Sequence, residues 1–230
     1  MTTPANKAML PVGETREAMF ARIRSALSER VAAEDPKAPA VDATLVRLCE
    51  PTADLAARFE KQATAVGLHV RRVSESSIIA ALAAILQGLS DCGVVLDVED
   101  AKVAEWAEAA LQAAGAARIG WEPEMALAAH FRADVSITDV DATIADSGSL
   151  VLSSGPERSR ASHLLAPIHI AIVRTEQVHA DHVDFWQHQA KATEAAATVL
   201  ITGPSKTADI EGVLVTGVHG PGTVHVLLVD

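Results

Sequence analysis

An amphipathic pattern near the start of the chain predicts a helix that is separate from the rest of the protein. Apolar residues form one stripe along the segment from Glu14 to Arg30, so this helix could pack on the main body or on a partner. The stripe consists of Phe20, Ile23 and Leu27. From Ala32 to Ala43, prolines and mixed charges interrupt the pattern, as in a linker. We expect residues 1–43 to form an appendage and residues 44–230 to form an α/β domain.

Helical patterns then alternate with short apolar runs. The predicted helices span Pro51 to Ala65, the segment of Ile78, Leu82, Ile85 and Leu89, and the segment from Val103 to Leu111. The predicted strands between them are His69 to Val73 and Gly93 to Leu96. Apolar, non-alternating strands between helices are typical of a mainly parallel sheet that is covered on both faces.

After Ala133, short apolar runs separated by a turn replace the alternation of helices and strands. The turn Asp146-Ser147-Gly148-Ser149 separates two short apolar runs, which predicts an antiparallel hairpin of Ala142 to Ala145 with Leu150 to Leu152. The remaining predicted elements are strands at His169 to Val173, Ala197 to Ile201 and Val224 to Val229, and a helix at Ala180 to Ala195.

One late segment is ambiguous between helix and strand. Ile210, Val213, Leu214 and Gly217 follow helical spacing, which favours a helix that begins near Thr207. The alternative is a strand through Gly212 to Val218, because valine-rich runs of this length fit both structures.

Composition narrows the possible partners. The 230 residues are 49% hydrophobic, which is enough for one sizeable core. The formal net charge is -11, so the chain repels a phosphate backbone and we expect no nucleic-acid binding. The N-terminus lacks the apolar region of a signal peptide, and no apolar run approaches the roughly 20 residues that cross a bilayer. We therefore expect a cytoplasmic protein without membrane insertion.

Neither the cysteines nor the histidines form a familiar metal motif. Cys49 and Cys92 lie far apart, so they form no iron–sulfur ligand set, and we expect buried thiols. A metal site is conceivable in a histidine-rich segment that contains His179, Asp181, His182 and Asp184. A surface helix rich in His and Asp is the commoner outcome, and flavin and nicotinamide fingerprints are absent from the sequence. We expect no metal and no cofactor.

The loop that comes after the strand Ala197 to Ile201 suits an anion. Its Gly-Pro turn exposes backbone N–H groups, and its other candidate ligand-binding groups come from Gly203, Ser205, Lys206 and Thr207. It is not a Walker A loop, because the glycine before the lysine is missing. The alternative is that Ser205 or Thr207 only caps a helix that has Asp209 and Glu211 in its first turn.

Two further loops bring charged or titratable groups to strand ends. The segment from Ser153 to Arg160 carries two arginines, which are suited to carboxylate or phosphate but are equally common in a solvated connection. A second loop holds His219 between glycines, where a structural histidine is the alternative to a functional one. We expect the loops Gly155 to Arg160 and Gly203 to Thr207 to face one cleft at the carboxyl ends of the sheet.

Acidic residues also crowd one region. They are Asp134, Asp139, Asp141 and Asp146. In an acidic protein such residues are usually solvated, and no pair of carboxylates or Ser/His/Asp set can be assigned to catalysis from its spacing.

Two blocks of sequence together resemble the lactate-utilisation protein C family, or LUD domain. They are ATIADSGSLVLSSGPERSRASHLLAPIHIAIV, at residues 142–173, and ITGPSKTADIEGVLVTGVHGPGTVHVLLV, at residues 201–229. The resemblance implies a Rossmann-like, mainly parallel sheet with helices on both faces plus the antiparallel hairpin. This is the fold of ribose-5-phosphate isomerase, glucosamine-6-phosphate deaminase and the CoA transferases.

The resemblance also implies which residues matter. The positions that match the family are Asp146, Ser147, Gly148, Gly155, Pro156, Arg160, His169, Gly203, Pro204, Ser205, Lys206, Thr207, Asp209, Glu211, His219, Gly220 and Pro221. In two places the sequence departs from the family. The hairpin acid is usually Glu and is Asp146 here, and Glu157-Arg158-Ser159 replaces a loop richer in glycine.

The implied function is a part in bacterial oxidation of L-lactate to pyruvate, together with iron–sulfur partner proteins. On this view the chain is a non-redox subunit that binds a small organic anion or a partner. The alternative is a free-standing enzyme like the isomerases and CoA transferases. It would use Lys206 with Asp209 or Glu211 on a phosphorylated or CoA-bearing substrate. A pure binding module is a third possibility, because fold alone does not decide function.

Overall fold

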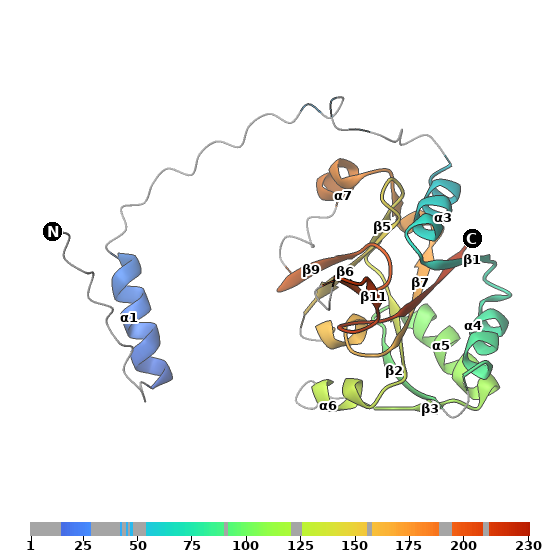
Figure 1. Ribbon diagram of the computed structural model, residues 1–230, viewed down its shortest axis with the longest axis horizontal. Coiled ribbons are helices and arrows are strands. Elements are labelled where there is room, and N and C mark those ends of the chain that lie inside the picture. Colours follow the sequence, from blue (N-terminus) through green and yellow to red (C-terminus); the bar gives the residue numbers. More distant parts are fainter. Residues whose placement is uncertain are drawn as a thin grey trace. The chain divides into compact units, whose positions relative to one another are not determined.

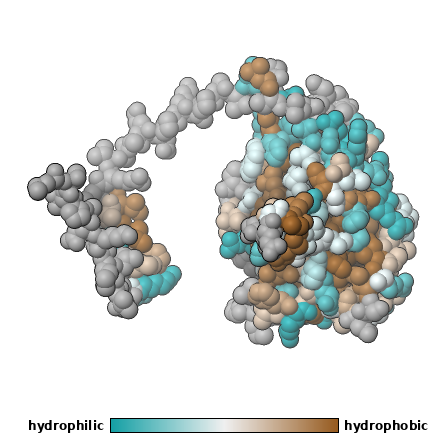
Figure 2. Space-filling model, viewed as in Figure 1, coloured by the Kyte–Doolittle hydropathy of each residue, from teal (hydrophilic) through white to brown (hydrophobic). Residues whose placement is uncertain are grey.

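A computed structural model describes most of the chain. It covers residues 15–28, 42, 45, 47, 54–89, 92–120, 126–155, 158–188, 195–208 and 212–230. The chain divides into two units, Met1–Val41 and Asp42–Asp230, which are described separately. In the first unit, helix α1 (Arg16–Ser28) has the predicted apolar stripe, which is exposed and lies along one side of the helix in Figure 2.

The second unit, drawn in Figure 1, is built on a six-stranded parallel sheet. The strand order of this sheet is β1-β12-β7-β4-β2-β3. Its strands are β1 (His69–Val73), β2 (Gly93–Asp97), β3 (Ala117–Arg118), β4 (Val135–Asp139), β7 (Ile168–Arg174) and β12 (Thr223–Val229). The central strands β7, β4 and β2 are almost wholly buried, and β7 and β2 are mainly apolar without alternation, whereas β4 alternates apolar residues with Ser136 and Thr138. The predicted parallel sheet is confirmed, and the sequence pattern missed β4 and the short β3.

Helices cover one face of this sheet. Helices α4 (Ile78–Gln87) and α5 (Ala101–Ala114) pack together on it, and their apolar residues form one core with those of β2, β4, β7 and β12. Asp100 caps α5 by accepting hydrogen bonds from the N–H groups of Lys102 and Val103, at 2.9 and 3.0 Å. Gly115 ends α5 in a left-handed conformation that suits glycine. The predicted helices in this region are confirmed.

The other face is covered by helix α3 (Leu55–Ala65) and a four-stranded sheet in the order β8-β5-β6-β9. The strands of this second sheet are β5 (Ala142–Ile144), β6 (Ser149–Ser154), β8 (Val178–His179) and β9 (Ala197–Ile201). Leu150 and Leu152 of β6 pack with Phe59 of α3 in a second core. Helix α7 (His182–His188) lies on the outer side, where Phe185 packs against Ile144 and Val151. The remaining elements are α6 (Ala126–Phe131) and two short 3-10 helices, η1 (Arg160–His163) and η2 (Thr175–Gln177).

The predicted hairpin is present, and its turn packs tightly against α3. Strands β5 and β6 pair antiparallel, with Ile144 opposite Ser149. Gly148 has a φ of 67°, and a Cβ atom there would lie 2.3 Å from the backbone nitrogen of Ala63. Arg58 of α3 donates a 2.9 Å hydrogen bond to Asp146 in the same turn. The match of this turn to the family pattern therefore has a packing reason.

The helix predicted from Thr207 is wrong. The described residues form two short antiparallel strands instead, β10 (Lys206–Thr207) and β11 (Val215–Thr216), which pair Thr207 with Val215. Residues 209–211 lie outside the described residues. The valines favour extended backbone because branching at Cβ restricts them in a helix, so the strand alternative was the better prediction for Val215.

No helix in the described part of the chain is long and apolar enough to cross a membrane. Cys92 is buried, as predicted, whereas Cys49 and Pro51 lie outside the described residues.

Candidate functional site

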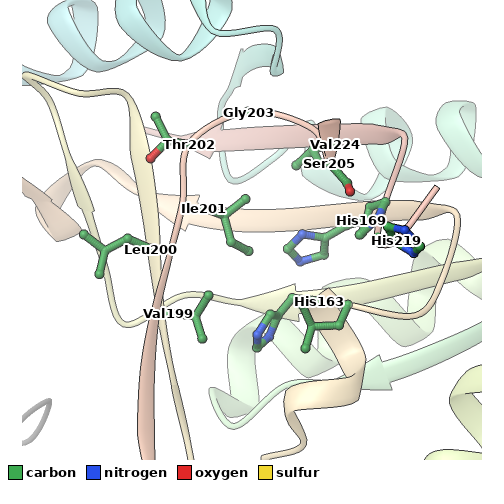
Figure 3. A pocket seen from close by; sticks show the side chains of 13 residues that line it. His163, His169, Val199, Leu200, Ile201, Thr202, Gly203, Ser205, His219 and Val224 are labelled. Atoms are coloured by element: carbon green, nitrogen blue, oxygen red, sulfur yellow. The ribbon is translucent and has the colours of Figure 1, made fainter. Parts of the chain in front are cut away.

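A cavity of about 230 Å³ lies between the two sheets, where the amino ends of β7 and β12 approach β9 (Figure 3). Its aliphatic wall consists of Leu164, Val199, Leu200, Ile201, Pro221 and Val224. Its remaining lining residues are His163, His169, Thr202, Gly203, Ser205, His219 and Gly220. An apolar wall with a few polar groups is typical of a site for a small molecule.

Two buried histidines give the cavity its chemistry. His163 ends the 3-10 helix η1, and His169 is the second residue of β7. In Figure 3 both imidazole rings point into the space that Val199 and Ile201 border from β9. The Nε2 atom of His169 is 2.9 Å from the hydroxyl oxygen of Thr138 on the neighbouring strand. This contact fixes the orientation of the ring through Nε2, and the other ring nitrogen, Nδ1, takes no part in it.

Both histidines are neutral at neutral pH. Burial, together with the positive charges of Arg158 and Arg160, lowers the pKa of His163 to about 4. Burial lowers the pKa of His169 to about 3, with a contribution from His163. Among the described residues, neither Nε2 of His163 nor Nδ1 of His169 has a hydrogen-bond partner. Buried polar atoms usually have partners, so these two nitrogens are candidate hydrogen-bonding groups for a ligand.

Backbone hydrogen bonds join the loop that contains Ser205 to the loop from Gly217 to Pro221. The N–H of Ser205 donates to the carbonyl of Pro221 at 2.9 Å, and the N–H of Gly217 donates to the carbonyl of Ser205 at 2.8 Å. Gly203 has a φ of 98°, and a Cβ atom there would lie 2.6 Å from the carbonyl oxygen of Val66. The backbone therefore requires glycine at this turn.

The structure brings only some of the sequence-predicted residues to this cavity. Gly203, Ser205 and His219 line it, and so does His169 from the family pattern. Lys206 is exposed and Thr207 is half-buried in β10, outside the lining, and Arg160 is exposed at the start of η1. Asp146 pairs with Arg58 in the hairpin turn. Asp209 and Glu211 lie outside the described residues.

The predicted common cleft at the carboxyl ends of the sheet is wrong. Strands β6 and β9 are antiparallel neighbours, with Leu150 opposite Ile201 and Ser154 opposite Ala197. The loop after Ser154 and the loop after Ile201 therefore leave opposite ends of this strand pair. The prediction assumed that both strands run parallel in one sheet, and pairing direction cannot be read from an apolar run.

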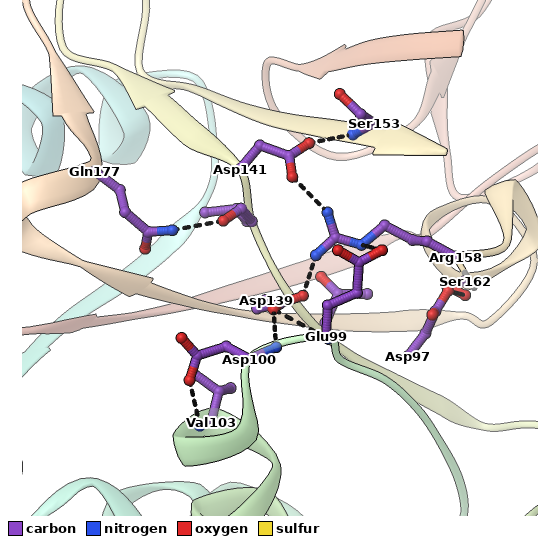
Figure 4. A network of polar contacts seen from close by, with 12 residues as sticks. Asp97, Glu99, Asp100, Val103, Asp139, Asp141, Ser153, Arg158, Ser162 and Gln177 are labelled. Carbon is purple, nitrogen blue, oxygen red and sulfur yellow. Dashed lines mark hydrogen bonds and ion pairs between the residues drawn. The ribbon is translucent and has the colours of Figure 1, made fainter. Parts of the chain in front are cut away.

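Arg158, which the sequence offered for anion capture, is committed to other residues in a buried network (Figure 4). Its guanidinium donates to Asp139 at the end of β4 and to Asp141 at 2.6 Å. Asp139 also accepts hydrogen bonds from the backbone N–H groups of Glu99 and Asp100, at 3.1 and 2.8 Å. Two of the four aspartates that looked solvated in the sequence, Asp139 and Asp141, thus contact a buried cation.

A further buried polar group lies next to this network. Asp97 ends β2 and accepts hydrogen bonds from the hydroxyl of Ser162 and from the N–H of Ser159, the latter at 3.0 Å. Ser162 is also 2.8 Å from Nε2 of His130. Burial raises the pKa of Asp97. These contacts fix η1, which also carries His163.

His163 was missed in the sequence because the segment that forms η1 has no recognisable motif. Within the family-like block its spacing from His169 was a possible signal, but only the fold shows that both rings face one cavity.

Comparisons with known proteins give the chain its family. The LUD domain model matches residues 56–229. The chain belongs to the LUD domain family. Its predicted resemblance is thereby confirmed, and the matched residues include the whole cavity and the Arg158 network.

Several relatives of this LUD domain are named lactate utilization protein C. The protein of that name from Oceanobacillus iheyensis is 34% identical over 110 residues, which cover 43% of this chain and 45% of the relative. The protein from Geobacillus kaustophilus is 39% identical over 109 residues, covering 44% of this chain and 45% of the relative. The chain spans about half the length of these curated relatives.

A solved structure supports the fold. A DUF162 family protein from Deinococcus radiodurans is 22% identical, with a TM-score of 0.57. The similarity covers 76% of this chain and 96% of that one. At this identity the match concerns the fold alone.

Proposed function

We propose that this LUD domain takes part in bacterial lactate utilisation by binding a small 2-hydroxy acid, such as L-lactate, in the histidine cavity. The observation that carries the proposal is the pair of buried, neutral imidazoles, each with an unpartnered nitrogen among the described residues. The names of the relatives support the choice of pathway.

The chemistry of a 2-hydroxy acid complements this cavity. A neutral imidazole offers one N–H donor and one acceptor nitrogen. A carboxylate accepts from such a donor, and the adjacent hydroxyl can both donate and accept. The methyl group of lactate would contact the aliphatic wall around Val199 and Ile201. The charges of Arg158 and Arg160, which lower the pKa of His163, also favour an anion at this end.

We also propose that the redox chemistry belongs to iron–sulfur partners. This sequence contains two cysteines, whereas a cluster is usually held by four thiolates. Oxidation of lactate to pyruvate releases two electrons, which the partner clusters would accept. Tagged chain purified from lactate-grown cells should bring down proteins that contain iron, and an absence of iron in such complexes would contradict the partner assignment.

Calorimetric titration of the purified chain with sodium L-lactate tests the cavity directly. We expect His163→Gln to weaken binding by about ten- to a hundredfold, because one hydrogen bond to a charged group contributes roughly 1.5–3 kcal/mol. Lys206→Ala is the matched control, since Lys206 is exposed outside the cavity lining, and it should bind like wild type. Equal affinities for wild type and His163→Gln would contradict the proposed site.

Pyruvate serves as a second ligand in the same titration. It retains the carboxylate and methyl group of lactate but lacks the hydroxyl proton, so we expect it to bind more weakly. Growth on L-lactate in a strain that lacks the gene, complemented with each variant, then separates the two parts of the proposal. Lactate binding without any effect on growth would preserve the site and reject the pathway.

A further inference from the structure

Two histidines and one aspartate meet at helix α7, away from the histidine cavity. One ligand atom of His179, one of Asp184 and one of His188 all lie within 4.8 Å of one another. None of these three described residues lines the cavity. We propose that they form a site for a divalent transition-metal ion such as Zn²⁺. Two imidazoles and one carboxylate are a ligand set that zinc uses in proteins.

The His–Asp distances are close to those of tetrahedral coordination. Nδ1 of His179 is 3.5 Å from Oδ2 of Asp184, and Nδ1 of His188 is 3.3 Å from its Oδ1. Nδ1 of His188 also lies 2.7 Å from the backbone carbonyl oxygen of Asp184, a contact that metal binding would break. With metal–ligand distances near 2.0–2.2 Å, tetrahedral ligand atoms lie about 3.3–3.6 Å apart. The two imidazole rings stack with their centroids 6.2 Å apart and an angle of 25° between their planes. Small rotations of the side chains would bring their ligand atoms around one ion.

The fold holds the ligands from two elements. His179 belongs to β8 and pairs with Ile144 of β5, so its backbone is fixed by the sheet. Asp184 and His188 lie one turn apart on the same side of α7. A site made this way joins the helix to the sheet, so metal binding would stabilise the position of α7.

Surrounding groups orient the ligands further. The N–H of Ala180 donates to Oδ2 of Asp184 at 3.1 Å, which fixes the carboxylate. The ring of buried Phe185 contacts that of His179 edge-on, with centroids 5.8 Å apart. Outer contacts of this kind are common around zinc ligands because they hold the directly bound side chains in place. Three protein ligands leave a fourth position for water.

The proposed set differs from the group considered in the sequence. His182, at helical spacing from His179, is exposed and does not belong to the cluster, whereas His188 does. It also replaces the expectation that the chain binds no metal. The competing explanation is that the three side chains only contact one another, through the His–Asp contacts and the contact of His188 with the backbone carbonyl of Asp184. A metal probe separates the two explanations, because such a cluster would bind no Co²⁺.

The test uses full-length, untagged protein that has been stripped with a chelator and titrated with Co²⁺ at neutral pH. We expect one equivalent of Co²⁺ to give a visible absorption band of tetrahedral type, and Zn²⁺ to displace it. His188→Ala should weaken Co²⁺ binding more than about a hundredfold, beyond the usual effect of an outer contact. His188 is exposed, so its replacement should leave the fold intact, and a circular dichroism spectrum checks this.

His182→Ala is the matched control, because it removes an exposed histidine from the same helix and should retain the band. In a second measurement, Zn²⁺ should raise the melting temperature of wild type and of His182→Ala but leave that of His188→Ala unchanged. Binding below one equivalent in wild type, or equal binding by wild type and His188→Ala, would overturn the proposal. Both results are independent of lactate, so they do not depend on the proposed function.

Discussion

The histidine cavity and the Arg158 network both bury polar side chains, but only the network keeps its charges. In the network, the two terminal nitrogens of Arg158 donate to Asp139 and Asp141, and Asp139 takes two further backbone donors. Nε of Arg158 has no hydrogen bond among the described residues and lies 3.8 Å from the carboxylate of Glu99. In the cavity, burial removes the charge from His163 and His169 and leaves one nitrogen of each without a partner among the described residues.

This difference separates a structural cluster from a ligand site. A buried ion pair that is completed by the protein offers little to a ligand, because a ligand would have to displace a carboxylate from Arg158. Neutral imidazoles that border a cavity gain hydrogen bonds when a ligand enters. The positions of charged residues in the sequence therefore do not predict which residues line the cavity. Arg158 and Arg160 looked suited to binding an anion, but they lie outside the lining and act on it only through their charge.

The largest expected effect concerns the network. Arg158→Ala should lower the free energy of unfolding by about 3–5 kcal/mol, because Asp139 would remain buried without this cation. Urea denaturation measures the loss. Exposed Arg160, two residues away, provides the control, and its replacement by Ala should change stability by less than about 0.5 kcal/mol. Similar small effects for both variants would remove the proposed distinction between network and cavity.

A second prediction uses the pH dependence of the cavity histidines. The pKa values of His163 and His169 are about 4 and about 3 in the folded protein, against an ordinary value of 6.5. The unfolded state therefore binds protons first as the pH falls, so stability is present above pH 6.5 and is lost toward pH 4. Each histidine should contribute about 1.4 kcal/mol per pH unit in this window.

Denaturation curves at several pH values check this slope. His163→Gln should make it shallower, because it removes one of the two groups. The raised pKa of Asp97 acts in the opposite direction, since its carboxyl binds a proton more readily in the folded state, and it should soften the loss at the acidic end. An unchanged slope in His163→Gln would mean that His163 is not buried and neutral.

The smallest expected effect is at Ser205. Its side chain is half-buried at the edge of the cavity, so Ser205→Ala should change the free energy of unfolding by less than about 0.5 kcal/mol. Lactate affinity should fall by a few fold if the hydroxyl contacts the ligand. A thermal melt measures the change in stability, and the lactate titration measures the change in affinity. A large loss of stability would assign Ser205 to the fold rather than to the site.

Much of the fold could be predicted from local patterns. The strand at Ala197–Ile201 and the helix at Ala101–Ala114 are evident from apolar runs and periodicity, because burial on one or both faces leaves a direct record in the sequence. The segment after Thr207 was mistaken for a helix, since its apolar spacing fits a helix while its pairing partner, Lys206–Thr207, lies several residues away. Pairing of this kind is not a local property.

The residues of the candidate site could also be predicted only in part from local sequence. Gly203, Ser205 and His219 were predicted from loop chemistry, and the resemblance to the LUD family added His169. Lys206 was predicted with them but is exposed outside the cavity, because alternate residues of an extended segment point to opposite sides. His163 belongs to no recognisable motif, so it was not predicted.

The sequence by itself determined the α/β class, most helices and strands, and the family. Those properties depend on residue order over short distances or on a pattern shared with relatives. Only the tertiary structure decided which polar residues meet. The antiparallel pairing of β6 with β9 sends two predicted anion loops to opposite ends, and the fold brings His163 of η1 and His169 of β7 to one cavity that β9 also lines. Burial then sets their charge, and burial is a property of the folded chain.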